Sequence, residues 1–386
     1  MKYRTNPKNG DSISALAFGF MRLNGRSESE IAQLVAYAVE SGVNYFDTAY
    51  VYPGSESALG RALAAGYRDR VKIATKLPPY QVKSRDDAER IFRAQLQRLR
   101  TGWIDYYLIH MLTSENAWRR LEALGIREWI EEKKAAGLIR NIGFSYHGGR
   151  EMFRRLVDAY DWEFCMIQYN YLDELNQAGR SGLEYAASKG LPVMVMEPLR
   201  GGTLAGRMPK EAGRLLREAA GERSPAEWGL RWVWNHSEVV TALSGMNSMA
   251  MLKENVRVAS EAEAGTMSER ELGVLAEARD VIRACMPVPC TGCAYCMPCP
   301  AGVDIPSCFS AYNDVAIEGR LKSLIRYAVR ISGHEASLCV KCGRCEPHCP
   351  QSIDIRRELA AVKRRMEGPL LRPLHAGIRS FLMLQK

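Results

Sequence analysis

The sequence predicts an α/β protein with two parts, a (β/α)8 TIM barrel and a smaller, α-rich C-terminal domain. Three observations lead to this fold class. The chain has 386 residues, whereas one hydrophobic core rarely serves more than about 250–300. Short apolar runs alternate with amphipathic stretches over residues 1–265, and ten of the eleven cysteines follow residue 284. We therefore expect a barrel at residues 1–267, a second domain at 268–369 and a tail at 370–386.

Eight short apolar runs are expected to form the strands of the barrel. They are residues 15–19, 43–48, 71–76, 105–110, 139–145, 163–169, 191–197 and 239–245. Eight such runs separated by helical segments over about 250 residues are typical of a (β/α)8 barrel. A doubly wound parallel sheet is the alternative.

A helix is expected to connect the two parts. Residues 268–284 have helical periodicity and open with Ser268 and Glu271 in capping-box spacing. This helix either closes the barrel or carries the second domain. The tail at 370–386 is amphipathic and basic, which favours packing on the protein's own surface; contact with a membrane surface or a partner is the alternative.

Composition excludes several classes of protein. Hydrophobic residues at 47% and charged residues at 25% are ordinary for a globular chain, and no apolar run approaches the roughly 18 residues of a transmembrane segment. The N-terminal residues lack the apolar core of a secretory signal, so we expect a cytoplasmic protein. The net charge of +9 is concentrated at residues 320–386, which hold 14 Lys and Arg against 5 Asp and Glu.

Two cysteine runs near the C-terminus have the spacing of 4Fe-4S ligands, each closing with Cys-Pro. The later run consists of Cys339, Cys342, Cys345 and Cys349 and has the spacing found in bacterial ferredoxins. The earlier run, with a last gap one residue shorter, consists of Cys290, Cys293, Cys296 and Cys299. The sequence therefore predicts a ferredoxin-like domain with two 4Fe-4S clusters, and structural zinc is the alternative. Because the basic surplus offsets the negative clusters, no nucleic-acid partner is expected.

The ligands of the two clusters are expected to cross between the runs. In two-cluster ferredoxins the cysteine before the proline binds the other cluster. By this rule Cys349 joins the first three cysteines of the earlier run, and Cys299 joins those of the later run. Cys165 is expected in the core. Cys285 and Cys308 flank the earlier run, and either replaces Cys299 if the shorter gap misplaces it.

Polar residues collect at the C-terminal ends of five predicted strands. They are Asp47, Lys76, His110, Ser145 and Gln168. Each taken alone has a structural explanation, such as helix capping or a hydrogen-bonded core histidine. Because barrel enzymes place their chemistry at this end of the strands, five residues in register indicate an active site.

With these residues in place, the sequence resembles the aldo-keto reductase family over residues 1 to about 265. The resemblance rests on the segment GVNYFDTA at residues 42–49 and on the strand ends that follow it. The positions matching the family's catalytic tetrad are Asp47, Tyr52, Lys76 and His110. Residues 19–23 and 196–202 resemble the subgroup that carries an appended 4Fe-4S domain.

The resemblance implies reduction of a carbonyl group by hydride and proton transfer. Tyr52 would donate the proton, and Lys76 would supply a neighbouring cation that makes the donation easier. Asp47 would anchor Lys76, while His110 would orient and polarise the substrate oxygen.

For the nicotinamide cofactor, the resemblance implies contacts at the same end of the barrel. Ser145 and Gln168 would bind the carboxamide, although Tyr146 stands where the family has asparagine, and Met196 where relatives stack a tyrosine on the ring. Gly245 and Met251, ahead of Asn255, replace the cations with which NADPH-preferring relatives bind the 2′-phosphate. The sequence therefore favours NADH or weak nicotinamide binding.

Three functions follow from these observations. The first is an oxidoreductase that reduces an aldehyde or ketone with NAD(P)H. Nicotinamides deliver hydride whereas clusters pass single electrons, so the second is electron transfer to or from a redox protein partner through an additional cofactor such as a flavin. The third is a non-catalytic binding or redox-sensing module, against which the complete tetrad argues.

Overall fold

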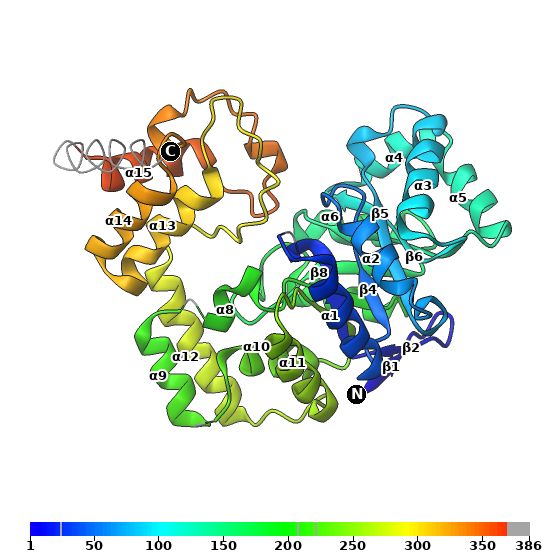
Figure 1. Cartoon of the computed structure of the whole chain (residues 1–386), viewed down its shortest axis with the longest axis horizontal. Coiled ribbons are helices and arrows are strands. Elements are labelled where there is room, and N and C mark those ends of the chain that lie inside the picture. The colour runs from blue at the N-terminus through cyan, green and yellow to red at the C-terminus, as the bar shows by residue number, and fades with distance from the viewer. Residues whose placement is uncertain (24, 207, 221, 369–386) are drawn as a thin grey trace. The chain divides into compact units, whose positions relative to one another are not determined.

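The chain divides into two compact units, seen in the computed structural model of Figure 1. The structure describes residues 1–23, 25–206, 208–220 and 222–368. The first unit comprises residues 1–199 and 226–272, and the second comprises 200–225 and 273 onward. The predicted domain boundary at 267/268 stays a prediction. The amphipathic tail predicted at 370–386 lies outside the described residues.

Eight parallel strands of the first unit form a closed barrel, so the (β/α)8 prediction is confirmed and the doubly wound alternative is wrong. Closure is direct, because the last strand pairs with both the first and the seventh. All eight predicted runs contain a strand. The strands are β3 (Leu16–Gly19), β4 (Tyr45–Asp47), β5 (Lys72–Leu77), β6 (Ile104–Leu112), β7 (Ile139–Tyr146), β8 (Phe164–Gln168), β9 (Val193–Met196) and β10 (Val239–Ser244).

Helices cover the outside of the barrel (Figure 1). They are α1 (Glu28–Glu40), α2 (Ser55–Leu63), α3 (Arg85–Leu99), α4 (Glu115–Ala123), α5 (Ile126–Ala135), α6 (Arg150–Asp158), α7 (Gly179–Ser188), α10 (Pro225–Trp234) and α11 (Met249–Glu261). A short antiparallel hairpin, β1 (Tyr3–Thr5) and β2 (Ser12–Ser14), precedes the barrel, and the 3-10 helix η1 (Phe20–Arg22) follows β3. The sequence did not predict the hairpin.

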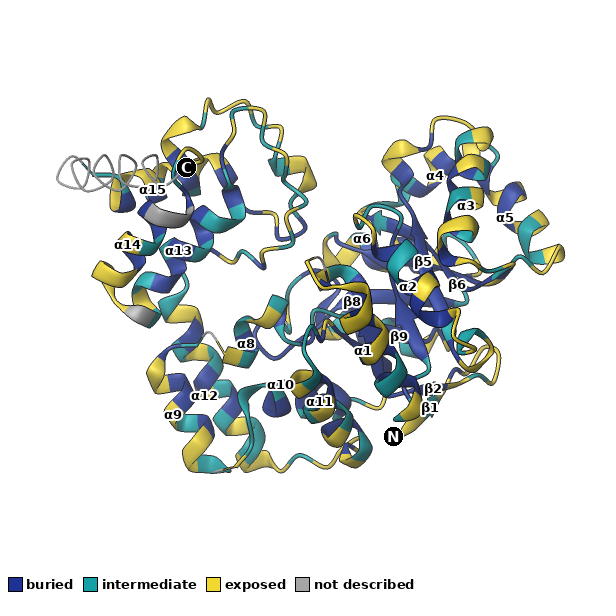
Figure 2. Ribbon diagram, viewed as in Figure 1, coloured by how far each residue is buried: buried dark blue, intermediate teal, exposed yellow. Residues whose placement is uncertain are grey.

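The strands form the core of the first unit. Figure 2 shows them buried inside a ring of helices whose outer faces are exposed. Side chains from different strands meet inside the barrel, among them Tyr45, Tyr106, Phe164 and Met194, all at most 1% exposed. Because the barrel interior is packed with side chains, chemistry is confined to its ends.

The second unit is α-helical. Its helices are α8 (Thr203–Gly206), α9 (Lys210–Ala219), α12 (Glu269–Cys285) from residue 273 onward, α13 (Ile305–Glu318), α14 (Arg320–Arg330) and α15 (Ile355–Met366). The expected helix at 268–284 is α12, and its capping box forms: the Glu271 carboxylate accepts from the Ser268 backbone N–H at 2.8 Å. No helix in the described ranges is long and apolar enough to cross a membrane.

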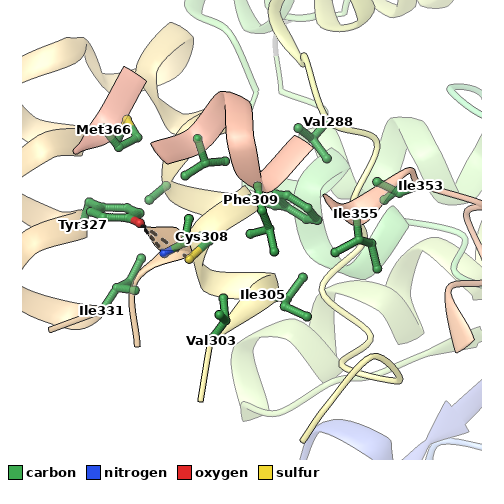
Figure 3. Packing of buried hydrophobic residues seen from close by; sticks show 14 of the residues in the cluster. Val288, Val303, Ile305, Cys308, Phe309, Tyr327, Ile331, Ile353, Ile355 and Met366 are labelled. Atoms are coloured by element: carbon green, nitrogen blue, oxygen red, sulfur yellow. Dashed lines mark hydrogen bonds between the residues drawn. The ribbon is translucent and has the colours of Figure 1, made fainter. Parts of the chain in front are cut away.

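Two similar sequence segments fifty positions apart, CPAGVDI at 299–305 and CPQSIDI at 349–355, form similar structures. After each Cys-Pro an aspartate caps a helix: Asp304 accepts from the N–H of Ser307 before α13, and Asp354 accepts from that of Arg357 before α15. Both helices pack into one hydrophobic core that includes Val288, Phe309 and Ile355 (Figure 3). Each copy therefore supplies one cysteine run and one helix of this core.

Candidate active site and cluster-binding sites

A buried ion pair lies at the C-terminal ends of β4 and β5. The Lys76 ammonium lies 2.6 and 2.8 Å from the two carboxylate oxygens of Asp47 and donates to the Thr48 carbonyl at 2.6 Å. Lys76 is 2% exposed and Asp47 4%. Burial lowers the pKa of Lys76 and raises that of Asp47, and the opposite charge of each partner counteracts both shifts. The pair therefore holds a cation in a site shielded from water.

A hydrogen-bonded layer beneath this pair fixes the backbone of β5. The Glu56 carboxylate accepts from the Thr75 hydroxyl at 2.7 Å and from the Gln95 amide at 3.1 Å. The same Gln95 amide donates to the Lys76 carbonyl at 3.0 Å. Glu56 and Gln95 are buried on α2 and α3, so the two helices hold Lys76 from outside the barrel.

Tyr52 and His110 lie beside the ion pair. Tyr52 is half-buried in the turn after β4, and the Lys76 ammonium lies 5.2 Å from the centre of its ring. His110 on β6 meets the Tyr52 ring edge-on, with ring centres 6.0 Å apart. Burial lowers the pKa of His110 well below 6.5, and the Lys76 charge and His147 lower it further. The structure thus brings the four predicted residues together, with His110 as a neutral hydrogen-bonding group.

The two residues predicted to bind the carboxamide lie at neighbouring strand ends and are buried. The Ser145 hydroxyl on β7 accepts from the backbone N–H of Met111 at 2.8 Å. The Gln168 amide on β8 donates to Asp173 at 3.0 Å and accepts from Gln177 at 2.8 Å. Both side chains are therefore held in fixed orientations.

Sequence reasoning missed His147, the residue that follows β7. Its Nδ1 lies 3.2 Å from the Gln177 side-chain oxygen, and burial lowers the pKa of His147 to about 4. A chain of hydrogen bonds determines the tautomer of His147. The Asp173 carboxylate accepts from the Gln168 amide NH2, and the Gln168 side-chain oxygen accepts from the Gln177 amide NH2. The Gln177 oxygen therefore accepts the proton on Nδ1 of His147. A histidine directly after Ser145 and Tyr146 at a strand end was the available sequence signal.

Residues predicted to select the cofactor lie at the ends of β9 and β10 and on α11. Met196 is half-buried at the end of β9, and Asn255 is buried with its amide 2.9 Å from the Ser244 hydroxyl. Met251 is 49% exposed. A side chain at Gly245 would meet Arg22, because an added Cβ there would lie 3.4 Å from the Arg22 Cδ. Arg22, whose side chain is exposed, therefore packs beside Gly245.

One group of cysteines combines residues from both runs. The first three cysteines of the earlier run line a small cavity together with Cys349 of the later run. Burial, together with the neighbouring Cys293, Cys290 and Cys349, raises the pKa of Cys296 to about 12. Cys349 thus lies with the earlier run, and its ligation of a cluster there stays a prediction.

A second group is partly reciprocal in composition. Burial raises the pKa of Cys345, and the nearby Glu346, Cys339 and Cys299 raise it further. Cys299 therefore lies near the later run despite its shorter gap. Cys308 lies in the core of the second unit, where its sulfur is 3.8 Å from the Tyr327 hydroxyl (Figure 3). Cys285 ends α12, and Cys165 is buried in β8.

The cysteines around the cavity are of the residue type that binds a 4Fe-4S cluster. Four cysteine thiolates hold such a cluster, and four cysteines line this cavity. Structural zinc sites can use four cysteines as well.

Comparisons with known proteins agree with both halves of this description. Residues 15–269 match the model of the aldo/keto reductase family, and residues 289–353 match that of a 4Fe-4S dicluster domain. An aldo-keto reductase from Mycobacterium sp. (strain MCS) is 31% identical over 240 residues, covering 61% of this chain and 78% of that protein. The 6-dehydroglucose reductase of Novosphingobium aromaticivorans is 28% identical, covering 68% and 90%.

Solved structures show the same fold. The aldo-keto reductase AKR11C1 from Bacillus halodurans, in its holo form, aligns with a TM-score of 0.60 and 27% identity, covering 72% of this chain and 96% of that one. An aldo/keto reductase from Klebsiella pneumoniae, solved with NADP and acetate, aligns at 0.59 and 22% identity, covering 72% and 95%. At that identity the Klebsiella structure supports the fold alone.

Proposed function

This chain belongs to the aldo/keto reductase family, a family of oxidoreductases, and from that premise we propose that its barrel reduces an aldehyde or ketone with hydride from NADH or NADPH. The observation that carries the proposal is the buried Lys76–Asp47 pair, with Tyr52 and His110 beside it at the strand ends. We place the protein in the cytoplasm, where its thiols stay reduced.

In the proposed reaction the side chains donate the proton and stabilise the negative charge that develops. Bound nicotinamide would supply hydride to the carbonyl carbon. Tyr52 would donate its hydroxyl proton to the carbonyl oxygen, and the Lys76 cation would stabilise the resulting phenolate. Asp47 holds Lys76 in place, and neutral His110 is suited to donate a hydrogen bond to the same oxygen.

We propose that the nicotinamide lies at the ends of β7 to β10. Ser145 and Gln168 would bind the carboxamide, with their orientations already fixed by Met111 and Asp173. Met196 would contact the ring. Gly245 and Asn255, at the end of β10 and on α11, would lie near the far end of the dinucleotide.

We further propose that the second unit holds two 4Fe-4S clusters. Cys290, Cys293, Cys296 and Cys349 would bind one, and Cys339, Cys342, Cys345 and Cys299 would bind the other. The shared cavity supports the first set, and the proximity of Cys299 to the later run supports the second. Basic residues after position 320 offset the charge of the clusters.

The cysteine sets also favour a second function, exchange of single electrons with a redox protein. A hydride carries two electrons and a cluster accepts one, so coupling the two chemistries needs a converter such as a flavin. The barrel would then use its site for a flavin-coupled or partner-coupled reaction rather than for direct hydride transfer.

Two measurements on anaerobically purified protein test these proposals. Chemical analysis should find about eight iron and eight sulfide per chain, as two 4Fe-4S clusters require; zinc in their place would remove the electron-transfer function. Aldehydes and ketones should then drive oxidation of NADH or NADPH without a flavin band in the optical spectrum. Turnover that depends on a copurifying flavin would favour the second function.

A further inference from the structure

The two copies of the cysteine repeat differ in how one equivalent position is exposed. The residue after the first cysteine is Thr291 in the earlier run and Val340 in the later run. Thr291 is 6% exposed, whereas Val340 is 70% exposed. The polar Thr291 is thus buried and the apolar Val340 is exposed, which is the reverse of the usual preference of polar side chains for water. A single exposed apolar side chain is ordinary by itself, so the residues around Val340 decide whether this surface binds a partner.

The two cysteine runs also differ in the number of charged residues between their cysteines. No charged residue lies between Cys290 and Cys299, while Lys341 and Arg344 lie between the first cysteines of the later run. Both cations are exposed, and neither forms an ion pair with any residue in the described ranges. The nearby acid Glu346 is already paired with Arg356 at 2.8 Å. The loop therefore offers two exposed cations to a partner beside the proposed cluster.

The same loop carries the most accessible cysteine of the chain. All eleven cysteines lie in the described ranges, and Cys342 alone is exposed. Leu338, two residues before Val340, adds a second apolar side chain at 38% exposure. A cluster held by Cys342 would have its edge nearest the solvent at this loop. Since electron transfer weakens steeply with distance, this edge is the best placed for exchange with another protein.

We propose that residues 338–344 form the docking surface for a small acidic protein that carries single electrons. The proposal rests on the cluster assignment above. The reduced carrier would give one electron to the cluster held by Cys339, Cys342, Cys345 and Cys299; the carrier is oxidised by one electron, and no bond forms or breaks. Two cations around an apolar centre fit a transient complex, in which charge steers association and a small apolar contact excludes water.

Three variants test the surface in the cluster-loaded protein. Lys341→Glu/Arg344→Glu reverses its charge, and Val340→Thr gives it the residue of the other repeat. Lys322→Glu/Lys363→Glu makes the same change of net charge at two exposed lysines outside the loop. The probe is a plant-type 2Fe-2S ferredoxin of net negative charge. Its dissociation constant and its electron-transfer rate are measured at low and high salt, and methyl viologen, a small cationic reductant, serves as the reference donor.

Each outcome decides for or against the proposal. Reversing both charges should weaken ferredoxin binding at least about 10-fold at low salt, with the difference shrinking as salt rises. Val340→Thr should weaken it at all salt concentrations, and the control pair should bind like the wild type. The inference would be overturned if the control pair lost as much ferredoxin affinity as the charge-reversed loop, or if reversing the loop charges left ferredoxin binding unchanged. It would also be overturned if the protein bound anionic lipid vesicles in place of ferredoxin. Failure of methyl viologen to reduce the wild-type protein would instead reject the redox-active clusters themselves.

Discussion

Tyr52 is the residue whose role in the proposed reaction is easiest to separate from binding. It lies beside the Lys76 ammonium and the His110 ring, and its hydroxyl is the proposed proton donor. Because general acid catalysis contributes about 10²–10⁴, Tyr52→Phe should lower kcat for carbonyl reduction at least about 10²-fold while nicotinamide affinity stays the same.

Steady-state kinetics and a nicotinamide titration check this expectation. Tyr50→Phe is the matched control, because Tyr50 lies in the same turn and its ring stacks on Arg98 at 4.6 Å. Turnover of the Tyr52 variant at the wild-type rate would assign the proton to another group.

His147 gives the barrel a pH-dependent stability. Burial lowers its pKa to about 4, against about 6.5 in an unfolded chain. Above pH 6.5 the His147 ring is neutral in both the folded and the unfolded state, and the contribution of His147 to the free energy of unfolding is at its maximum. As pH falls from about 6.5 to about 4, the unfolded state gains the proton first, so stability is lost, by about 3 kcal/mol for this one group.

His147→Gln should remove that part of the acid destabilisation. Urea unfolding of the barrel, followed by tryptophan fluorescence at pH 7 and pH 4.5, should show a smaller difference between the two pH values in the variant than in the wild type. An equal difference in both proteins would contradict the inferred neutral state of His147.

At the residue scale, the sequence predicts the residues whose positions the strands determine. Asp47, Lys76 and His110 end or lie near the ends of parallel strands, so register alone brings them together. The contact of His147 with Gln177 depends instead on the loop after β8, where Gln177 has a positive φ of 56°. Loop conformation follows no periodicity, and sequence patterns therefore did not reveal it.

At the scale of elements, hydrophobic periodicity predicted all eight barrel strands. It missed β1 and β2, because three-residue strands are too short to show alternation. It also missed the grouping of residues 200–225 with the second unit, in which the Arg200 guanidinium donates to the Pro289 carbonyl at 3.1 Å. Contacts across nearly ninety residues leave no local signal in a single sequence.

Crossed ligation is a prediction about the two cysteine runs as elements. Cys349 lines the cavity of the earlier run, so Cys349→Ala should disturb the cluster of Cys290, Cys293 and Cys296 first. Cys299→Ala is the matched variant and should disturb the other cluster. Electron paramagnetic resonance of the reduced proteins distinguishes the two. If each variant loses the cluster of its own run, ligation is local and the ferredoxin-type topology is wrong.

We predict that the region from β10 to α11 governs the choice of nicotinamide. With Gly245 and Met251 where a 2′-phosphate would need cations, NADPH should bind no tighter than NADH in a fluorescence titration. A preference for NADPH above about 100-fold, or about 2.7 kcal/mol, would contradict this and require another cation. Arg22, which packs beside Gly245, is then the first residue to replace, and Arg22→Gln should abolish the preference.

At the scale of the whole molecule, one chain combines an aldo/keto reductase barrel with a 4Fe-4S dicluster domain. Sequence patterns predicted both halves: alternating apolar and amphipathic segments predicted the barrel, and the cysteine spacing predicted the cluster domain. Neither sequence pattern predicts the path of electrons between substrate, nicotinamide and clusters. That path has to be measured on protein that holds both its clusters and its nicotinamide.

The most direct test traces hydrogen from the nicotinamide to the product. Anaerobic, cluster-loaded protein is given an aldehyde and NADH or NADPH carrying deuterium on either face of the reactive ring carbon, and the alcohol is analysed by mass spectrometry. Direct hydride transfer predicts one deuterium on the former carbonyl carbon, from one face only. Alcohol formed without deuterium from either labelled face, while the nicotinamide is oxidised, would show that electrons reach the substrate through another carrier and would contradict the proposed reaction.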